Sequence, residues 1–307
     1  MLLSSILLVV SSGSYANSAP PEINYDEAKV PDYVLPDSLI CLDGTQVNNA
    51  GGWFEKRRPE ILHLFEEFVY GRVPGELENI NFKVISIDSE SLNGKAIRKE
   101  VGISFGDHEG SPRINILLYL PPDLKKPVPT FVGLNFYGNH TIHSDPGIKL
   151  SEQWVNNNQE LGIENDRATE RSRGSNSSRW EVEQILDRGY ALATIYCGDM
   201  DPDFHDGFQN GVHPLLYQAG QTKPAPNEWG TISAWAWGLT RAMDYSEVDQ
   251  DIDHERVAVM GHSRLGKAAL WAGAQDTRFA LVISNNSGCC GGGLVETTFR
   301  RNCSQNQ

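Results

Sequence analysis

The sequence contains few basic residues for its length. Its 307 residues include 26 lysines and arginines against 40 aspartates and glutamates, which gives a formal net charge of −14. Nucleic acids and anionic membranes are bound through clustered Lys and Arg, so this acidic chain is a poor candidate for either partner. Internal repeats, low-complexity tracts and long charge blocks are also missing. What remains is a globular chain, and its 39% hydrophobic content is enough for a sizeable core.

Patterns of metal ligands are missing as well. The five cysteines are Cys41, Cys197, Cys289, Cys290 and Cys303. A zinc site would require a C-x-x-C pair or closely spaced histidines beside them, and neither is present. We therefore expect no metal and no cofactor. In a secreted chain this count is compatible with one disulfide and leaves an odd thiol, but the sequence does not give the pairing.

Long hydrophobic runs are confined to the start of the chain. Residues 1–16 are apolar through LLSSILLVV and end in SYA, which is typical of a secretory signal peptide with its cleavage site. The absence of Lys and Arg before the apolar run departs from that pattern, and a buried N-terminal segment is the alternative. No other segment approaches the roughly 20 apolar residues of a spanning helix. We expect a secreted or periplasmic protein, with residues 17–52 as an extended leader.

Strand and helix patterns alternate after the leader. Helices are predicted over 54–73, 180–188 and 231–245. Strands are predicted over 82–87, 101–105, 113–120, 129–135, 190–196, 257–260 and 279–284. This alternation predicts an α/β fold, an α/β-hydrolase-type three-layer sandwich with a mostly parallel sheet, helices on both faces and antiparallel strands leading in.

The most informative stretch is VAVMGHSRLGKAALWAGA, residues 257–274. Four apolar residues predict a buried strand, the alanine-rich end predicts a helix, and GHSR leaves room for only a sharp turn between them. A serine at such a turn is exposed beside a helix N-terminus, as in the G-x-S-x-G elbow of hydrolases. Here Leu265 takes the place of the second glycine, and Gly266 follows. Ser263 is therefore either a nucleophile or an ordinary helix N-cap.

The segment GHSRLGK resembles the G-x-S-R-x-G-K motif of the glucuronoyl esterases, carbohydrate esterase family 15, in their bacterial branch. Other segments that resemble this family are RRPEIL with YGRVP (57–74), LNFYGNHT (134–141), SRWEVEQILDRGYALAT (178–194), DPDFHDGFQNGVH (201–213), EWGTISAWAWGL (228–239) and WAGAQDTRFALVISNNSG (271–288). The resemblance covers residues 53–288, which we expect to form the catalytic domain. It implies a serine esterase that hydrolyses esters of (4-O-methyl-)glucuronic acid between plant cell-wall glucuronoxylan and lignin, through an acyl-enzyme and without a cofactor. An acetylxylan esterase with the same elbow is the nearest alternative.

The resemblance also implies roles for residues around the turn. Ser263 matches the nucleophile, Arg264 an arginine that stabilises the oxyanion, and Lys267 a lysine that contacts sugar hydroxyls. Otherwise Arg264 would form a surface ion pair and Lys267 would be a solvated charge. In hydrolases of this architecture the loop after the PTFVGLN strand often supplies a second oxyanion donor. Asn139 and His140 are therefore either oxyanion-side residues or part of a hydrogen-bonded surface turn.

Two further groups of residues invite a binding role. The three aspartates of DMDPD (199–203) lack a second ligand group at loop spacing, so we interpret them as turn residues rather than a calcium site. Trp229, Trp235 and Trp237 are candidates for a sugar platform. Residues two apart on a helix cannot share a face, which favours core packing for at least one of the last two.

A general base is not apparent. A serine nucleophile needs a histidine held by a carboxylate, and in this architecture both follow the serine. All eight histidines precede Ser263, and the adjacent His262 is expected to point away from it. Asn286 stands where the family places a glutamate. Only 44 residues follow the serine, and the resemblance ends at Gly288. We expect residues 289–307 to be an irregular tail, in a chain that is cut short or shifted in frame and lacks the C-terminal strands of the fold. The alternative to an active esterase is an inactive fragment or a non-catalytic carbohydrate-binding remnant.

Overall fold

The computed structural model describes residues 26, 28, 34–77, 79–106, 114–123, 126–289 and 291. The expected signal peptide (1–16), the first half of the leader and nearly all of the expected tail lie outside the described residues, as do Cys290 and Cys303. Cys41 and Cys197 are buried and form no disulfide. No helix in the described part of the chain is both long and apolar enough to cross a membrane.

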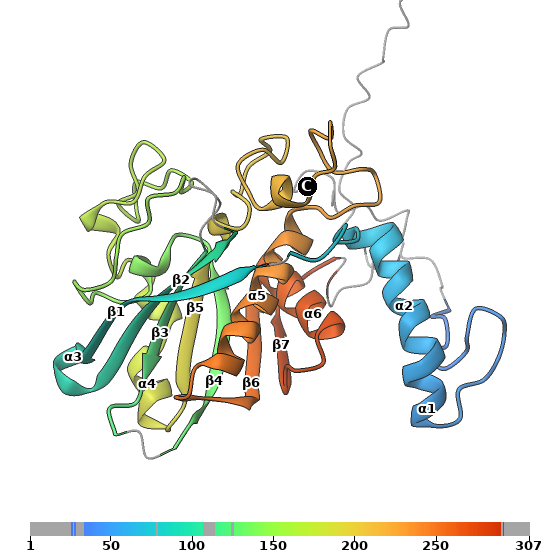
Figure 1. Ribbon diagram of the computed structural model, residues 1–307, viewed down its shortest axis with the longest axis horizontal. Coiled ribbons are helices and arrows are strands. Elements are labelled where there is room, and N and C mark those ends of the chain that lie inside the picture. Colours follow the sequence, from blue (N-terminus) through green and yellow to red (C-terminus); the bar gives the residue numbers. More distant parts are fainter. Residues whose placement is uncertain are drawn as a thin grey trace, which may run out of the picture.

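In the described part of the chain, seven strands form one mixed sheet in the order β1-β2-β3-β5-β4-β6-β7 (Figure 1). The strands are β1 (Ile80–Glu90), β2 (Ala96–Phe105), β3 (Ile114–Leu120), β4 (Val128–Asn135), β5 (Ala191–Tyr196), β6 (Ile252–His262) and β7 (Leu281–Asn285). The pairs β1–β2, β2–β3 and β3–β5 are antiparallel, whereas β5–β4, β4–β6 and β6–β7 are parallel. The structure confirms an α/β-hydrolase-like sheet into which antiparallel strands lead.

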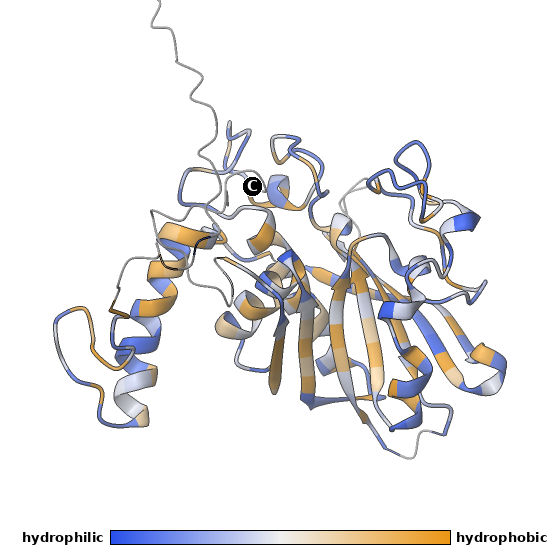
Figure 2. Ribbon diagram, turned by 180° about the vertical axis from the view of Figure 1, so that it is seen from behind, coloured by the Kyte–Doolittle hydropathy of each residue, from blue (hydrophilic) through white to orange (hydrophobic). Residues whose placement is uncertain are grey.

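Helices cover both faces of this sheet. Helices α5 (Thr231–Val248) and α6 (Arg264–Gln275) pack together on one face, and α4 (Val182–Asp187) lies on the other (Figure 1). Alternate residues of β3 serve the two layers, because successive side chains of a strand point to opposite faces. Ile116 and Leu118 belong to the core under α5 and α6, while Leu117 and Tyr119 belong to the core under α4. The strands β3, β4 and β5 are accordingly largely apolar (Figure 2).

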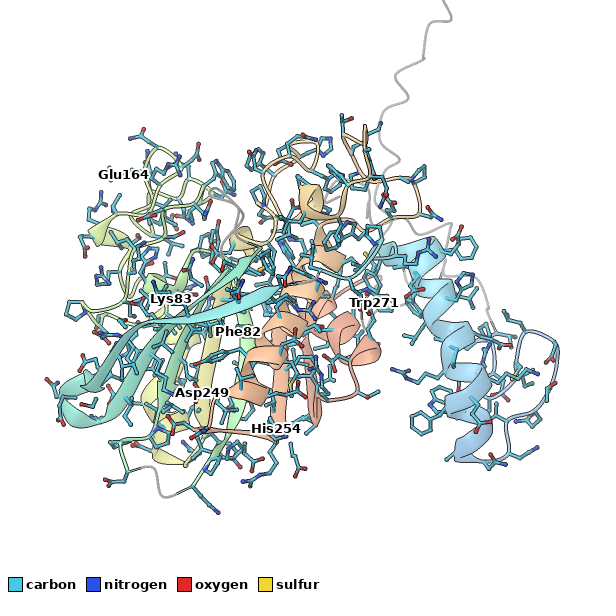
Figure 3. All side chains as sticks on the ribbon, in the orientation of Figure 1. Phe82, Lys83, Glu164, Asp249, His254 and Trp271 are labelled. Atoms are coloured by element: carbon cyan, nitrogen blue, oxygen red, sulfur yellow. The ribbon has the colours of Figure 1, made fainter. Side chains whose placement is uncertain are left out.

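A helical arm precedes the sheet. It runs through α1 (Ala50–Gly52), the π-helical turn η2 (Trp53–Arg57), α2 (Arg58–Phe65) and the π-helical turn η3 (Glu66–Tyr70). Its C-terminal end is anchored on α6 near Trp271 (Figure 3). The rings of Tyr70 and Trp271 lie 4.8 Å apart. The arm ends at Gly71, whose φ is 76° and where a Cβ would lie 2.2 Å from the carbonyl oxygen of Glu228. The helical spacing of Ile61, Leu62, Phe65, Phe68 and Val69 predicts one packing face for this arm. That face is only partly covered, since Phe68 is 76% exposed.

Short helices lie within the loops. They are α3 (Ser91–Gly94) and the 3-10 turns η4 (Asn139–Thr141), η5 (Glu170–Ser172), η6 (Ser177–Arg179), η7 (Cys197–Asp199) and η8 (His213–Leu216). The longest loops follow β4 and β5, at the sheet edge where α/β proteins bind ligands. Trp229, Trp235 and Trp237 are all buried in the core next to these loops. The interpretation of these tryptophans as a sugar platform is therefore wrong.

Candidate active site

The predicted strand, turn and helix meet at Ser263. Strand β6 ends at His262 and α6 begins at Arg264, so Ser263 alone makes the turn. Its φ of 57° and ψ of −126° lie in a region that residues with a side chain rarely adopt, at a cost of roughly 1–3 kcal/mol. The surrounding backbone holds it there. The Ser263 amide donates to the carbonyl oxygen of Asn285 at 3.0 Å, and its carbonyl oxygen accepts from the Gly266 amide at 2.9 Å.

Two glycines make this turn possible. A Cβ on Gly261 would lie 2.0 Å from the carbonyl oxygen of Leu265, and a Cβ on Gly266 would lie 3.0 Å from that of Asn285. The second glycine is thus needed where α6 passes β7, one position later than in G-x-S-x-G. The Leu265 side chain is free to be buried in the core. The N-cap alternative does not hold, because the Ser263 hydroxyl makes no capping hydrogen bond to the described start of α6.

Ser263 lines a cleft of about 900 Å³ at the carboxyl ends of β4, β6 and β7. The walls include Phe136 and Tyr137 from the loop after β4, and Arg179 with Trp180 before α4. This volume is within the roughly 300–1,000 Å³ of small-molecule sites. No described residue hydrogen-bonds the Ser263 hydroxyl, which is therefore open to a ligand. Sequence patterns place Trp180 on a helix and give no sign that it lines the cleft.

Arg264 lies in the same cleft and is held by two side chains. Both terminal nitrogens of its guanidinium contact the carboxylate of Asp203, with Nη2 at 2.8 Å. The guanidinium also lies over the ring of Phe136, 5.5 Å from its centroid. Burial raises the pKa of Asp203, and the guanidinium opposes that shift. A bidentate pair and an aromatic contact fix the direction of the arginine before any ligand arrives.

The three aspartates of residues 199–203 serve three different places. Asp203 holds Arg264, and Asp199 lines a second cavity. Asp201 accepts from the Thr231 hydroxyl at 2.6 Å and lies 3.4 Å from His213 Nδ1 in the core. All three lie in the turns that follow β5, as expected, but each side chain also makes a contact distant in sequence that the pattern did not predict. In the described part of the chain, no group of three His, Cys, Asp or Glu side chains could hold a metal ion.

The loop after β4 differs from the expectation. Asn139 accepts a hydrogen bond from Asn135 Nδ2 at 2.8 Å and lines the second cavity. His140 is fully buried with Nε2 2.8 Å from the hydroxyl of Ser172, and burial lowers its pKa to about 4. Neither side chain is part of the lining of the cleft at Ser263. The aromatic pair 136–137 of the same loop lines it instead.

Lys267 lies on the first turn of α6, four residues after Ser263, and is half-buried. Its ammonium group makes no hydrogen bond or ion pair with the described residues, and it is not part of the cleft lining. Its expected contact with sugar hydroxyls stays a prediction.

None of the seven described histidines hydrogen-bonds Ser263. The ring of His262 lies 3.2 Å from the side-chain amide of Asn285. His254 lies near the start of β6, at the opposite end of the sheet from the elbow (Figure 3). Asn286, at the position where the family places a glutamate, is exposed and outside the cleft lining. The neighbouring Asn285 lines the cleft in its place.

Comparisons with known proteins agree on one group. A family model of fungal glucuronyl esterases matches residues 215–306. The chain is 52% identical to Carbohydrate esterase MZ0003 from an unknown prokaryotic organism, over 96% of this chain and 69% of that protein. It is 27% identical to the 4-O-methyl-glucuronoyl methylesterase of Schizophyllum commune, over 95% of this chain and 59% of that protein. The chain thus spans 59–69% of the length of these two relatives.

Solved structures give the same picture. A glucuronoyl esterase from Solibacter usitatus is 49% identical with a TM-score of 0.81, covering 86% of this chain and 66% of that one. A promiscuous CE15 esterase from the marine bacterial metagenome is 54% identical with a TM-score of 0.80, covering 88% and 67%. The likeness therefore includes most of the described fold.

Proposed function

Because the chain belongs to carbohydrate esterase family 15, we propose that it hydrolyses esters of glucuronic acid with Ser263 as the nucleophile. The observation that carries the proposal is the strained backbone of Ser263, at the tip of β6 and inside a cleft of about 900 Å³. Such strain persists only where the surrounding structure enforces it, and it is concentrated at active sites. Here two close-packed glycines and the carbonyl oxygen of Asn285 enforce it.

The reaction proceeds in two steps. The Ser263 hydroxyl oxygen attacks the ester carbonyl carbon, the carbonyl oxygen takes the negative charge of a tetrahedral intermediate, and the alcohol leaves as an acyl-enzyme forms. Water then attacks the acyl-enzyme and releases the uronic acid and the serine. No described histidine or carboxylate contacts the serine oxygen.

Arg264 and the start of α6 are the proposed oxyanion donors. The backbone N–H groups of Arg264 and Leu265 have no backbone acceptor among the described residues, and the helix dipole favours negative charge at this end. The guanidinium of Arg264 is already oriented by Asp203 and Phe136. One fixed donor of this kind lowers the barrier by about 2.7–4 kcal/mol.

The proposed substrate is the uronate ester of glucuronoxylan, with a lignin alcohol on its other side. The cleft offers the amides of Asn156, Asn158 and Asn176 for sugar hydroxyls, and Trp180 supplies an aromatic surface. Lys267 is one turn beyond the serine on the same side of α6, with an ammonium group that pairs with no described residue. We assign to it a contact with the sugar.

Acetylated xylan is the second candidate substrate. A serine elbow attacks acyl groups in general, and the marine relative at 54% identity is described as promiscuous. Export from the cytoplasm belongs to the proposal as well and is supported by the composition of residues 1–16. N-terminal sequencing of the secreted protein should begin near residue 17.

The test is hydrolysis of a benzyl ester of glucuronic acid by the purified chain. Ser263→Ala serves as the control variant, and acetylated xylan is the competing substrate. Turnover of the glucuronate ester that is lost with the serine supports the proposal. Turnover of acetylated xylan alone supports the second candidate. A folded sample that binds glucuronoxylan and hydrolyses neither substrate contradicts the catalytic role and supports a carbohydrate-binding remnant.

A further inference from the structure

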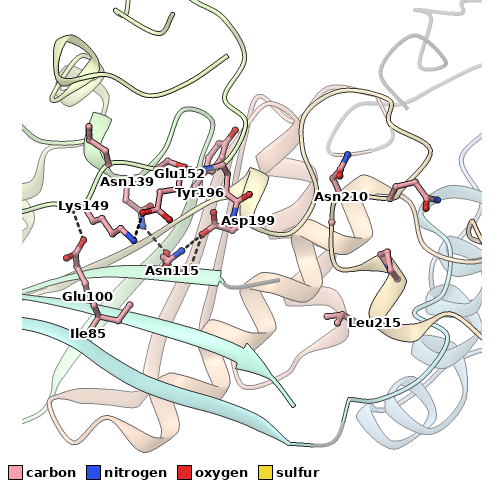
Figure 4. A pocket seen from close by; sticks show the side chains of 16 residues that line it. Ile85, Glu100, Asn115, Asn139, Lys149, Glu152, Tyr196, Asp199, Asn210 and Leu215 are labelled. Atoms are coloured by element: carbon pink, nitrogen blue, oxygen red, sulfur yellow. Dashed lines mark hydrogen bonds and ion pairs between the residues drawn. The ribbon is translucent and has the colours of Figure 1, made fainter. Parts of the chain in front are cut away.

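A second cavity opens beside the carboxyl end of β5 and shares no lining residue with the cleft at Ser263. Its volume is about 590 Å³. Glu100 of β2, Asn115 of β3 and Asp199 of η7 line one side, and segments 149–153 and 209–215 line the others (Figure 4). The reaction proposed at Ser263 uses no residue of this cavity.

The central group of the cavity is the carboxyl of Asp199. Its side chain is buried, and its Oδ2 accepts hydrogen bonds from the backbone amide of Asn115 at 2.8 Å and from Asn115 Nδ2 at 3.3 Å. The other oxygen has no partner among the described residues. Burial raises the pKa of Asp199 to about 7. Asp199 therefore presents to the cavity one carboxyl oxygen that pairs with no described residue. A buried carboxyl with a raised pKa in a cavity is a candidate for ligand binding.

A chain of amides fixes the wall next to Asp199. Asn139 Nδ2 donates to the carbonyl oxygen of Asn115 at 2.9 Å, and Asn139 Oδ1 accepts from Asn135 Nδ2 at 2.8 Å. Asn135 in turn lines the cleft at Ser263. The two sites therefore lie on either side of one hydrogen-bonded run of asparagines.

The charges of the cavity exclude an anionic ligand. Glu100, Glu152 and Asp199 contribute three carboxyl groups, and Lys149 contributes the one ammonium group of the lining. That ammonium lies 3.0 Å from Glu152 Oε1, so it is already neutralised. The remaining surface combines amides, as on Asn210, with apolar side chains. Groups that both donate and accept, with little net positive charge, suit the hydroxyls of a neutral sugar.

We propose that this cavity is a subsite for a neutral sugar unit of the polysaccharide whose uronate ester enters the cleft at Ser263. The choice of polysaccharide rests on the proposed function. The cavity volume is within the range of sites for small ligands, and the neutral main chain of xylan carries such units next to its uronate branches. The subsite would bind the main chain while the branch is at the serine.

The experiment is calorimetric titration of the Ser263→Ala chain with xylotriose at millimolar concentrations, followed by the same titration with sodium glucuronate. Saturable binding of xylotriose and weaker binding of glucuronate are expected. Asp199→Ala should weaken xylotriose binding by about tenfold. Asn210→Ala, an exposed change at the rim that does not touch the core, should weaken it by about fivefold, the effect of one lost neutral hydrogen bond.

Asn227→Ala is the matched control, because Asn227 is an exposed amide that lines neither cavity. Its xylotriose affinity should be unchanged. Absence of xylotriose binding, or binding that neither Asp199→Ala nor Asn210→Ala weakens, overturns the subsite. Tighter binding of glucuronate that depends on Asn210 overturns its neutral specificity. The assay needs no ester hydrolysis, so these results stand apart from success or failure of the esterase proposal.

Discussion

The strain at Ser263 can be measured without any substrate. Ser263→Ala and Ser263→Gly both remove the hydroxyl, but only glycine adopts φ 57° and ψ −126° freely. Release of the strain stabilises the folded state by about 1–3 kcal/mol. The extra freedom of glycine in the unfolded chain opposes this by about 0.5–1 kcal/mol. We expect Ser263→Gly to be more stable than Ser263→Ala by about 0.5–2 kcal/mol.

The assay is urea unfolding followed by the fluorescence of the buried tryptophans Trp229, Trp235 and Trp271. Thermal unfolding should show the same order, at about 2–4 °C for each kcal/mol in a chain of this size. Ser104, in the extended backbone of β2, is the matched control site. There the order should reverse, with the glycine variant about 0.5–1 kcal/mol less stable than the alanine variant.

One outcome would refute the structural argument. If glycine is no better than alanine at Ser263, and the two sites behave alike, the turn carries no strain. The assignment of Ser263 as nucleophile would then rest on sequence similarity alone.

Three further predictions follow from the site and its surroundings. Asp203→Asn should lower kcat for the glucuronate ester about tenfold with little change in KM, because Arg264 loses the partner that orients it. Steady-state kinetics test this. The control Asp253→Asn, which breaks a surface pair with Arg256, should leave kcat unchanged. Gly261→Ala should prevent stable folding, since the new Cβ would lie 2.0 Å from a backbone oxygen. Circular dichroism on heating tests this, and an unfolding transition like that of the unsubstituted chain would contradict it. Burial raises the pKa of Asp199 from 3.8 to about 7, so the folded state binds the proton of this carboxyl group more tightly than the unfolded chain does. The folded state therefore loses stability as the pH rises from about 4 to 7. Asp199→Asn should remove that loss of stability, of up to about 4 kcal/mol. The urea midpoints of the variant and the unsubstituted chain should therefore move apart from pH 4 to pH 8, and a constant difference would contradict the prediction.

Local sequence patterns predicted the helices and strands of the fold, but not which of their faces are buried. The apolar run before Ser263 and the alanines after it gave the strand, turn and helix, because these preferences act within a few residues. The antiparallel strands before β4 were predicted for the same reason. Helix periodicity suggested a packed face for the arm at residues 54–73, yet Phe68 of that face is exposed.

The contacts of the site were less accessible to sequence reasoning. The sequence left Asn139 and His140 either beside the serine or in a hydrogen-bonded surface turn, but the η4 turn directs His140 into the core and Asn139 into the second cavity. The tryptophans of α5 offered the right chemistry for sugar binding, but the core takes them all. Which face of a loop or helix is buried depends on its neighbours in space.

The pair formed by Arg264 and Asp203 shows what kind of knowledge was missing. Phe136 follows β4, Asp203 follows β5 and Arg264 follows β6, and these strands are neighbours in the order β5-β4-β6. Carboxyl ends of parallel neighbours meet at one edge of a sheet, so three loops far apart in sequence bring one residue each to a single cleft. A parallel sheet was predicted, but its strand order was not. Without that order Asp203 had no visible partner, and an acidic residue after a strand is most simply interpreted as part of a turn. With the order known, the same carboxylate is the nearest available counter-charge for an arginine at the elbow.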